Sequence, residues 1–523
     1  MKGAVAAGHP LTAAAGARVL EEGGNAVDAC VAGAFAAWVA ESPLTGPGAG
    51  GFALVVPSDG RPARVADFFV STPGIGSPAP AEAEMHAIDV EFGGDSETTQ
   101  VFRIGQASCA VPGAAAGLEA VHRAYGRLPW RVLLEPAIEL ARAGVEISRP
   151  QAHLHAILDL ILRHTEEGRR LYSRSDGSRL GPGDVLGLSD LGGTFEQLAD
   201  EGASALYRGE LADAIVRTVA AGGGAITARD LADYRVAWRR PVRVGYLGHE
   251  VISNPPPSSG GILIAYGLAL LDRMPARDAG SAEAVAALAE VMREQGRARG
   301  PGFTRDLHRG GLPGRLLSPA SLRTALRRID ARLAGAAEAA PPGGTTHVSA
   351  LDADGNAAAL STSTGSGSGV VVPGTGVYLN NMLGEFDLVG GAVPRPGVRL
   401  TSMMAPTVVL DAAGAPRLVV GSAGSARLRG AIMQIVVNVL GHGMGVEEAI
   451  AAPRIHVDEP YVHCEGGHDP VELDRLHALG YEVVRWRRRN LFFGGAAAVE
   501  RLPDGSEAAA GDPRRGGAGA LAG

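Results

Sequence analysis

The sequence predicts a layered α/β (α+β) fold, in which helices flank strand-rich blocks. Apolar residues recur with helical spacing from Leu11 to Gly23 and from Asn25 to Val39, where Asn25 is the expected N-cap. A mainly helical region follows from about 113 to 240, whereas 346–420 is rich in strands. The hydrophobic content of 46% over 523 residues is ample for the core that such layers require.

Each further element follows from its local pattern. Strands are expected at 52–56, 63–69 and 241–253, and helices at 115–125, 133–143, 262–274, 282–299, 428–441 and 446–451. Two alternating apolar runs on either side of 352–356 predict a β-hairpin, because Asp and Gly there supply the turn dihedrals. A linker rich in Ala and Pro occupies 331–342 and a loop 384–398, and the Gly/Ala-rich tail from about residue 505 is expected to be poorly ordered.

Charge and hydropathy exclude several classes of protein. The 48 basic and 56 acidic residues give a net charge of −8 without a long block of one sign, so neither nucleic acid nor an anionic membrane is an expected partner. No apolar stretch reaches the ~20 residues that a membrane span needs. The chain opens without a charged-then-apolar leader, which predicts a cytoplasmic protein.

The metal-ligating residue types form no recognisable metal motif. The three cysteines are far apart and odd in number, so buried free thiols are expected rather than disulfides or a zinc cluster: Cys30, Cys109 and Cys464. One short segment gathers residues that are expected to be polar surface groups: His456, His463, Glu465, His468 and Asp469. Their spacing matches no zinc arrangement, and we therefore expect no metal and no cofactor.

Two loops resemble catalytic or phosphate-binding motifs without meeting their requirements. A phosphate-binding glycine loop follows a strand and precedes a helix, whereas Gly46–Gly51 follows a helix and precedes a strand, so it is expected to be a tight packing turn. The segment Pro257–Gly260 contains two serines but lacks the Gly-x-Ser-x-Gly pattern of a nucleophile elbow.

Thr345 is the strongest candidate nucleophile. It opens a strand directly after the linker, in the stretch Gly343–His347. If the Gly344–Thr345 bond were cut, the new α-amino group would lie beside the Thr345 hydroxyl and supply base and nucleophile in one residue. Taken alone, the Thr-Thr pair suits the plain start of a β-strand equally well, because threonine favours strands.

The surrounding motifs favour the catalytic interpretation. They run in order through the chain: Ala6–Leu11, Gly23–Ala29, Pro43–Phe52, Val111–Gly113, Leu128–Trp130, Pro255–Gly261, Thr345–His347, Leu379–Asn381, Ser402–Met403, Gly421–Gly424 and Ala452–Arg454. In this set and order the sequence resembles the γ-glutamyltranspeptidase family of self-cleaving N-terminal-nucleophile (Ntn) hydrolases over nearly its whole length. The resemblance implies a four-layer αββα sandwich, with a large-subunit region at 1–344 and a small-subunit region at 345–523 folded together.

The resemblance also implies a mechanism. Thr345 would attack the Gly344 carbonyl, and water would resolve the ester into two chains. The freed α-amino group, with a reference pKa near 8, would then act as base while Thr345 forms an acyl-enzyme. Backbone N–H groups of Gly424 and Ser425 would hold the oxyanion, although the family has glycine at the position of Ser425.

One further catalytic position remains open between neighbours. Ser363 falls near the family threonine that hydrogen-bonds the nucleophile. A local shortening of two residues makes Thr362 and Thr364 alternatives.

The substrate-binding shell departs from the family pattern. The arginine that reads the glutamate α-carboxylate is replaced by Phe69, and a glutamine by Met382, while Glu385 retains an acidic group suited to an ammonium. The paired family serines correspond to Thr401 and Ser402. A phenyl ring cannot replace the bidentate hydrogen bonds of a guanidinium, so weak or absent action on glutathione is expected. Three other arginines are candidates to compensate: Arg395, Arg399 and Arg427.

Three functions remain open at this point. The first is a self-processing hydrolase or acyltransferase acting on a non-glutathione amide of specialised metabolism. The second is a C–C bond hydrolase that removes an oxalyl-type group, because similar homologues are associated with the 4-alkyl-proline units of lincosamide and pyrrolobenzodiazepine antibiotics. The third is an unprocessed, inactive scaffold, against which the retention of Thr345 and Gly424 argues.

Overall fold

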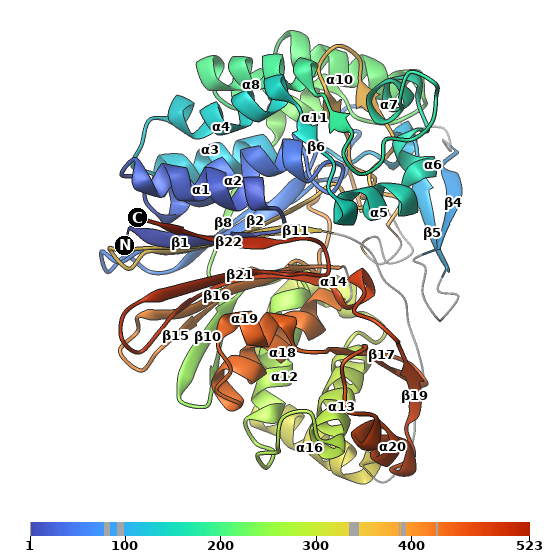
Figure 1. The fold of residues 1–523 in the computed structure, drawn as a ribbon. Coiled ribbons are helices and arrows are strands. Elements are labelled where there is room, and N and C mark those ends of the chain that lie inside the picture. The colour runs from blue at the N-terminus through green and yellow to red at the C-terminus, as the bar shows by residue number, and fades with distance from the viewer. Residues whose placement is uncertain are drawn as a thin grey trace.

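The protein is a four-layer αββα sandwich (Figure 1). The computed structural model describes residues 2–77, 84–91, 99–333, 345–385, 388, 394–424 and 427–523. Two sheets face each other at the centre, and a helical layer covers the outer face of each. The predicted fold class is confirmed.

The two central sheets interleave strands from the beginning, middle and end of the chain. The seven-stranded sheet runs, in spatial order, β22 (Ala518–Ala522), β1 (Gly3–Ala7), β11 (Thr346–Asp352), β12 (Ala357–Ser363), β2 (Gly50–Val56), β3 (Arg64–Phe68) and β8 (Ala237–Arg239). The six-stranded sheet runs β21 (Glu507–Gly511), β20 (Gly495–Arg501), β16 (Pro416–Ala423), β15 (Thr407–Leu410), β10 (His249–Ser253) and β9 (Val242–Tyr246). Every pairing in both sheets is antiparallel.

The helices divide between the two outer layers. On the side of the seven-stranded sheet lie α1 (Pro10–Glu21), α2 (Ala26–Ala40), α3 (Ala114–Tyr125), α4 (Trp130–Ala143), α5 (Arg149–Ile157), α6 (Asp159–Leu162), α7 (Glu166–Tyr172), α8 (Ser189–Glu201), α9 (Ser204–Tyr207), α10 (Glu210–Ala221) and α11 (Ala228–Asp233). On the side of the six-stranded sheet lie α12 (Gly260–Leu271), α13 (Ala282–Ala298), α14 (Phe303–Arg309), α15 (Leu312–Leu316), α16 (Pro319–Arg332), α18 (Leu428–Gly441), α19 (Val446–Ala451) and α20 (Pro470–Ala478).

The described residues also form four small sheets outside the two central ones. They are β4 (His86–Glu91) with β5 (Thr99–Ile104), β6 (Val145–Glu146) with β7 (Val185–Leu186), β13 (Val371–Val372) with β14 (Val377–Tyr378), and β17 (Ile455–Asp458) with β18 (Tyr461–Cys464) and β19 (Glu482–Arg485). Within the described residues, no helix is both long and apolar enough to cross a bilayer.

Three hydrophobic cores hold the four layers together. One lies between the first helical layer and the seven-stranded sheet, and another between the six-stranded sheet and the second helical layer. The third fills the space between the sheets and includes Phe52 and Leu54 from one sheet and Val408 and Val419 from the other. Such stacking buries both faces of each sheet, which explains why the strands around the site consist almost entirely of buried residues.

Local sequence signals account for the elements near the site. Helix α2 begins at the predicted cap, where Asn25 and Asp28 form a reciprocal capping box. The β11–β12 hairpin turns at the predicted residues, with Gly355 at φ +88 and the Asp352 carboxylate accepting from the Asn356 N–H at 2.9 Å. A second oxygen of Asp352 accepts from the Ala26 N–H at 2.9 Å, which joins this hairpin to the start of α2.

The expectation of a poorly ordered C-terminal tail is wrong. Residues 507–511 and 518–522 form β21 and β22, one in each central sheet. Their small side chains reflect close packing, because a Cβ at Gly519 would lie 2.0 Å from the Ala509 carbonyl oxygen. The loop at 384–398 and the linker at 331–342 fall largely outside the described residues, and α16 continues to Arg332 at the start of the linker.

The expectation of a polar surface around residues 456–469 is also largely wrong. His456, His463 and Glu465 are buried, and only Asp469 is well exposed. Strands β17 and β18 place both imidazoles against Phe492, and the indole N–H of Trp486 donates to His463 Nδ1 at 3.1 Å. The three cysteines are buried free thiols, as predicted.

Candidate active site

Thr345 lines a pocket together with residues from the end of β12, the start of α18 and several loops. It immediately precedes β11 and is 4% exposed. The pocket has an empty volume of about 340 Å³, including solvent at its mouth. Its described lining residues are Phe69, Thr345, Ser363, Gly365, Met382, Glu385, Leu388, Ser402, Met403, Met404 and Leu428. Glu385 is the only ionisable side chain among these described lining residues, and most of the others are apolar.

The structure distinguishes Ser363 from its two neighbours. Side chains alternate between the faces of a strand, so residues 362 and 364 point away from the face that presents residue 363. The Thr362 hydroxyl bonds the Thr45 hydroxyl at 2.6 Å, and the Thr364 hydroxyl donates to the Pro43 carbonyl at 2.6 Å. Ser363 lines the pocket with Thr345, and its oxygen accepts from the Gly365 N–H at 2.8 Å.

Phe69 forms one wall of the pocket, and contacts with its ring and its backbone fix its position. Its ring stacks on Phe52 with 5.6 Å between centroids, and its N–H donates to Asp67 at 3.1 Å. Its carbonyl accepts from the Tyr234 hydroxyl at 2.7 Å and from the Arg399 guanidinium. The position that a carboxylate-reading arginine would occupy therefore carries a fixed, buried phenyl ring.

Arg399 is fully engaged on the outer side of this wall. Its guanidinium packs 4.7 Å over the Tyr234 ring, pairs with Asp67 at 3.4 Å, and donates to the Arg235 carbonyl at 2.6 Å. It does not line the pocket, and neither does Arg427, whose guanidinium lies 4.4 Å over the Phe492 ring. Burial lowers the pKa of Arg427 to about 9. Arg395 is exposed.

Two adjacent asparagines shape the opposite wall. Asn380 is completely buried, donates to the carbonyls of Gly48 and Ala110 at 2.8 Å each, and accepts from the Met382 N–H at 3.1 Å. Asn381 and Glu385 both accept from the Ser366 N–H, at 3.0 and 3.2 Å. These contacts fix Met382 and Glu385 in the pocket wall.

Gly365 permits the close approach of these groups. Its φ is +76, and a Cβ there would lie 2.2 Å from the Asn381 side-chain oxygen and 3.2 Å from the Glu385 carboxylate. A side chain at this position would therefore displace the pocket wall.

The segment 402–404 lines the pocket and packs against the Pro255–Gly261 loop. The Ser402 carbonyl accepts from the Ser259 N–H at 2.7 Å and from the hydroxyls of Ser258 and Ser259 at 3.1 and 2.9 Å. Both loop serines are buried and hold backbone, which agrees with the absence of a nucleophile-elbow motif. Thr401 is not among the described lining residues, because its hydroxyl donates to the Leu388 carbonyl at 2.7 Å. Sequence reasoning missed Met403, which lines the pocket beside Ser402.

The expected oxyanion and cleavage positions are only partly described. Gly424 has a φ of +120, which suits glycine, and Leu428, the first residue of α18, lines the pocket. Gly424 itself is not one of the described lining residues. Ser425 and Gly344 lie outside the described residues.

A buried ion pair contacts Thr345 on the side away from the pocket. Arg515 donates to the Thr345 carbonyl at 2.9 Å and to the Glu41 carboxylate at 2.9 Å. The Thr346 hydroxyl donates to the same carboxylate. Sequence reasoning missed both charged residues, because they lie hundreds of residues apart and no local spacing joins them.

Other site classes find no support in the geometry. In the part of the chain that the structure describes, no three His, Cys, Asp or Glu side chains gather as a metal site would require. The Gly46–Gly51 loop is a packing turn: a Cβ at Gly48 would lie 2.3 Å from the Tyr378 carbonyl oxygen, and one at Gly51 2.2 Å from that of Ser361.

Comparison with known proteins identifies the family. The family model described as gamma-glutamyltranspeptidase matches residues 12–522. The acylase ACY 1 proenzyme of Pseudomonas sp. (strain SE83) is 35% identical over 97% of this chain and 91% of its own. The glutathione hydrolase proenzyme of Escherichia coli (strain K12) is 31% identical over 98% of this chain and 90% of its own. The solved cephalosporin acylase of Bacillus halodurans superposes with a TM-score of 0.83 at 25% identity, covering 99% of this chain and 96% of its own.

The family match, the relatives and the four layers agree with one another, and each spans nearly the whole chain. The chain belongs to the γ-glutamyltranspeptidase family and is an enzyme of the Ntn hydrolase and transferase type.

Proposed function

We propose that the protein is a self-processing N-terminal-threonine acylase whose substrate is an amide other than glutathione. In the continuous chain, the Thr345 hydroxyl attacks the Gly344 carbonyl carbon. A C–O bond forms, the C–N bond of the Gly344–Thr345 peptide breaks, and the departing nitrogen takes a proton. Water then cleaves the ester, which leaves a Gly344 carboxylate and restores the Thr345 hydroxyl beside a free α-amino group.

The same residue then acts on the substrate. The neutral α-amino group accepts the hydroxyl proton as Thr345 attacks the acyl carbonyl, and it returns the proton to the leaving amine. We assign to Ser363 the hydroxyl that hydrogen-bonds the nucleophile; its presence in the pocket lining with Thr345 supports this assignment. Backbone N–H groups of Gly424 and Ser425 are assigned to the oxyanion. Water or a second amine takes the acyl group from Thr345.

The proposed substrate class rests on the residues that line the pocket. Phe69, Met382, Met403 and Leu428 present apolar surface to a bound acyl group, and no described lining residue is cationic. A carboxylate placed against this wall would lose its hydration without gaining a charged partner. Glu385 favours a substrate with an ammonium or another donor group at the mouth. The relatives that are named acylases support an amide substrate.

A second candidate function is hydrolysis of a C–C bond in a keto acid. An apolar pocket also suits a cyclic amino-acid derivative, and an N-terminal threonine attacks an activated keto carbonyl as it does an amide. The protein would then release oxalate from a keto acid in antibiotic biosynthesis instead of an amine from an amide.

The first experiment measures the intact mass of the purified protein and of Thr345→Ala. Two fragments that meet at Gly344–Thr345 in the wild type, and one chain in the variant, are expected. An uncut wild-type chain would refute the proposal and favour the inactive scaffold.

Matured protein is then offered p-nitroanilides with γ-glutamyl, apolar acyl or amino-substituted apolar acyl groups, and separately a keto acid with oxalate as readout. Release from the apolar anilides at least ten times faster than from the γ-glutamyl one is expected. Phe69→Arg should shift this preference toward γ-glutamyl by at least tenfold, because a guanidinium adds charge-assisted hydrogen bonds. Val471→Arg, at an exposed apolar position, is the matched control. Oxalate release without anilide hydrolysis would select the second candidate.

A further inference from the structure

The residues that begin β11 lack a strand neighbour on one side. The pairing of β1 with β11 ends at Ala7 opposite Val348, whereas β12 continues to pair as far as Thr346. Thr345 and Thr346 therefore extend beyond β1 at an open position in the sheet. The backbone of a nucleophile that extends beyond β1 has to be fixed by groups outside that strand.

Arg515 and Glu41 occupy the place of the missing strand. The Arg515 guanidinium donates 2.9 Å to the Thr345 carbonyl, 2.9 Å to Glu41 and 3.0 Å to the Thr346 hydroxyl. Glu41 also accepts from the Thr12 hydroxyl at 2.9 Å. Consecutive side chains point to opposite faces of a strand. The Arg515–Glu41 pair therefore contacts the Thr346 side chain on one face, while Thr345 lines the pocket on the other.

The surroundings of the pair indicate that it is built into the fold. Its side chains are only 6% and 3% exposed. A Cβ at Gly8 would lie 2.3 Å from the Glu41 carboxylate, and one at Gly495 would lie 2.2 Å from the Arg515 side chain. Glu41 is the C-cap of α2, the end of a helix where a carboxylate is disfavoured by the helix dipole. The facing guanidinium offsets this unfavourable placement.

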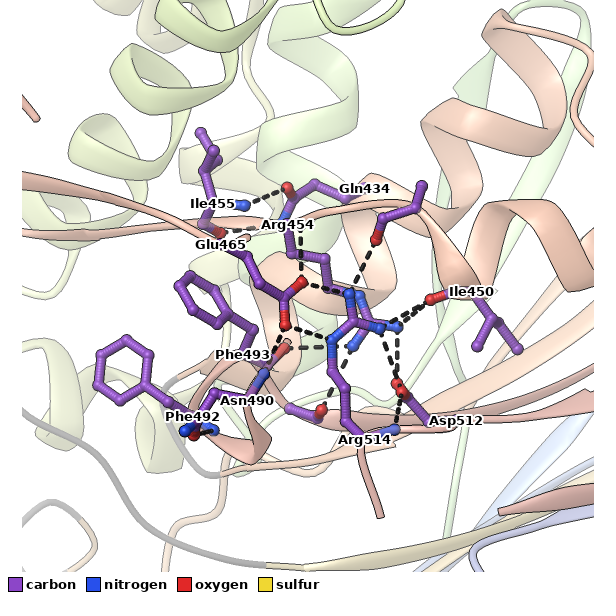
Figure 2. A network of polar contacts seen from close by, with 12 residues as sticks. Gln434, Ile450, Arg454, Ile455, Glu465, Asn490, Phe492, Phe493, Asp512 and Arg514 are labelled. Atoms are coloured by element: carbon purple, nitrogen blue, oxygen red, sulfur yellow. Dashed lines mark hydrogen bonds and ion pairs between the residues drawn. The ribbon is translucent and has the colours of Figure 1, made fainter. Parts of the chain in front are cut away.

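A second network anchors the turn that carries Arg515. Asp512 accepts from the Ala496 N–H at 2.9 Å, and it pairs with Arg454 at 2.7 Å and with Arg514 at 3.1 Å. Arg514 forms two hydrogen bonds with Glu465 and donates to the Ala452 carbonyl at 2.9 Å (Figure 2). The two adjacent arginines thus have different partners. Arg514 bonds Glu465 and the Ala452 carbonyl, whereas Arg515 bonds the Thr345 carbonyl.

We infer that Arg515, held by Glu41, is a positioning residue that fixes the Thr345–Thr346 backbone for attack on the Gly344 carbonyl. The inference rests on the proposed function, in which Thr345 is the nucleophile of self-cleavage. The planar guanidinium is suited to this task because it spans a carboxylate and a carbonyl at the same time, whereas a lysine ammonium is a compact point charge on a flexible stem. Neither residue is among the described residues that line the substrate pocket.

The test follows the first-order rate at which full-length chain converts into two fragments, measured by intact mass beside thermal melting. Arg515→Met alone leaves the Glu41 carboxylate buried without its cation, so loss of folding would confuse the result. The decisive variant is Glu41→Gln/Arg515→Met, which removes both charges together. It should melt near the wild-type temperature and convert at least tenfold more slowly. Arg489→Gln, at an exposed arginine of the same region, is the matched control and should convert at the wild-type rate.

Arg515→Lys provides the second measurement and decides the question if the double variant fails to fold. This variant retains a cation beside Glu41 and should melt like the wild type. It should nevertheless convert at least tenfold more slowly, because an ammonium cannot reproduce the planar guanidinium that donates to Glu41 and to the Thr345 carbonyl together. Conversion of either folded variant at the wild-type rate overturns the positioning role. A wild-type chain that is never cut overturns the proposed function and this inference with it, whereas a cut wild type with equally fast variants overturns the inference alone.

Discussion

Acidification should destabilise the protein through His347, two residues after the candidate nucleophile. The ring lies between the two central sheets and is 1% exposed, and a Cβ at Gly421 would lie 2.2 Å from it. Ser349 donates to the Ala497 carbonyl at 3.1 Å and therefore accepts from His347 Nε2, at 2.9 Å. Nδ1 is left to accept from the Ser361 hydroxyl at 2.7 Å. This arrangement uses a neutral imidazole.

Burial lowers the pKa of His347 to about 3, from 6.5 in the unfolded chain. Above pH 6.5 the ring is neutral in both states, and its contribution to stability is fully present. As the pH falls from 6.5 toward 3, the unfolded chain binds a proton that the folded chain excludes, so stability is lost. Between about pH 7 and about pH 4.5 this difference amounts to about 2.5 kcal/mol.

Urea unfolding at these two pH values measures the effect, with Thr345→Ala as the background so that every chain is uncut. His347→Gln retains one donor and one acceptor but does not titrate in this range. Its free energy of unfolding should fall by about 2.5 kcal/mol less than that of the background protein. His456 and His463 titrate in both proteins and cancel in the comparison. Equal losses in the two proteins would refute the assignment of this pH dependence to His347.

Two further predictions concern the site and its support. Ser363→Ala should slow fragment formation at least tenfold, because it removes a hydroxyl from the pocket, and should lower the free energy of unfolding by about 1–3 kcal/mol, because the buried Gly365 N–H loses its acceptor. Thr362→Val removes a hydroxyl that bonds Thr45 outside the pocket, so its conversion rate should stay within about threefold of the wild type; the opposite ranking of these variants would reassign the position. Asp512→Asn should lower the free energy of unfolding by about 3–5 kcal/mol, since two buried arginines lose a shared carboxylate. The exposed Asp504→Asn should leave denaturant unfolding unchanged, and an equal effect at both positions would contradict this account.

Local signals predicted much of the fold. The cap at Asn25 and the turn at 352–356 follow from short-range chemistry, and both occur where expected. The tail could not be predicted in this way. Its strands contain mostly alanine and glycine, which carry little strand signal. β22 forms because β1, from the opposite end of the chain, pairs with it, and β21 forms because it pairs in a hairpin with β20. The buried imidazoles near residue 460 depend in the same way on aromatic residues that arrive about thirty positions later.

The candidate site shows a similar division. The family resemblance indicated Phe69, Met382 and Glu385 together, and all three line the pocket with Thr345. Strand alternation separates Ser363 from Thr362 and Thr364 only once the pairing partners of β12 are known. Ser402 lines the pocket, whereas Thr401 is not among its described lining residues, and no periodicity reveals that Arg515 meets Glu41.

The arrangement of strands has a consequence for the molecule after cleavage at the proposed bond. Strand β1 belongs to the first product, yet it lies between β11 and β22, which both belong to the second. The second sheet is shared as well, since β10 from the first product pairs with β15 from the second. Neither product can leave without opening hydrogen-bonded ladders along both sheets. Maturation would therefore break one peptide bond while the two polypeptides stay associated and unfold together as one unit.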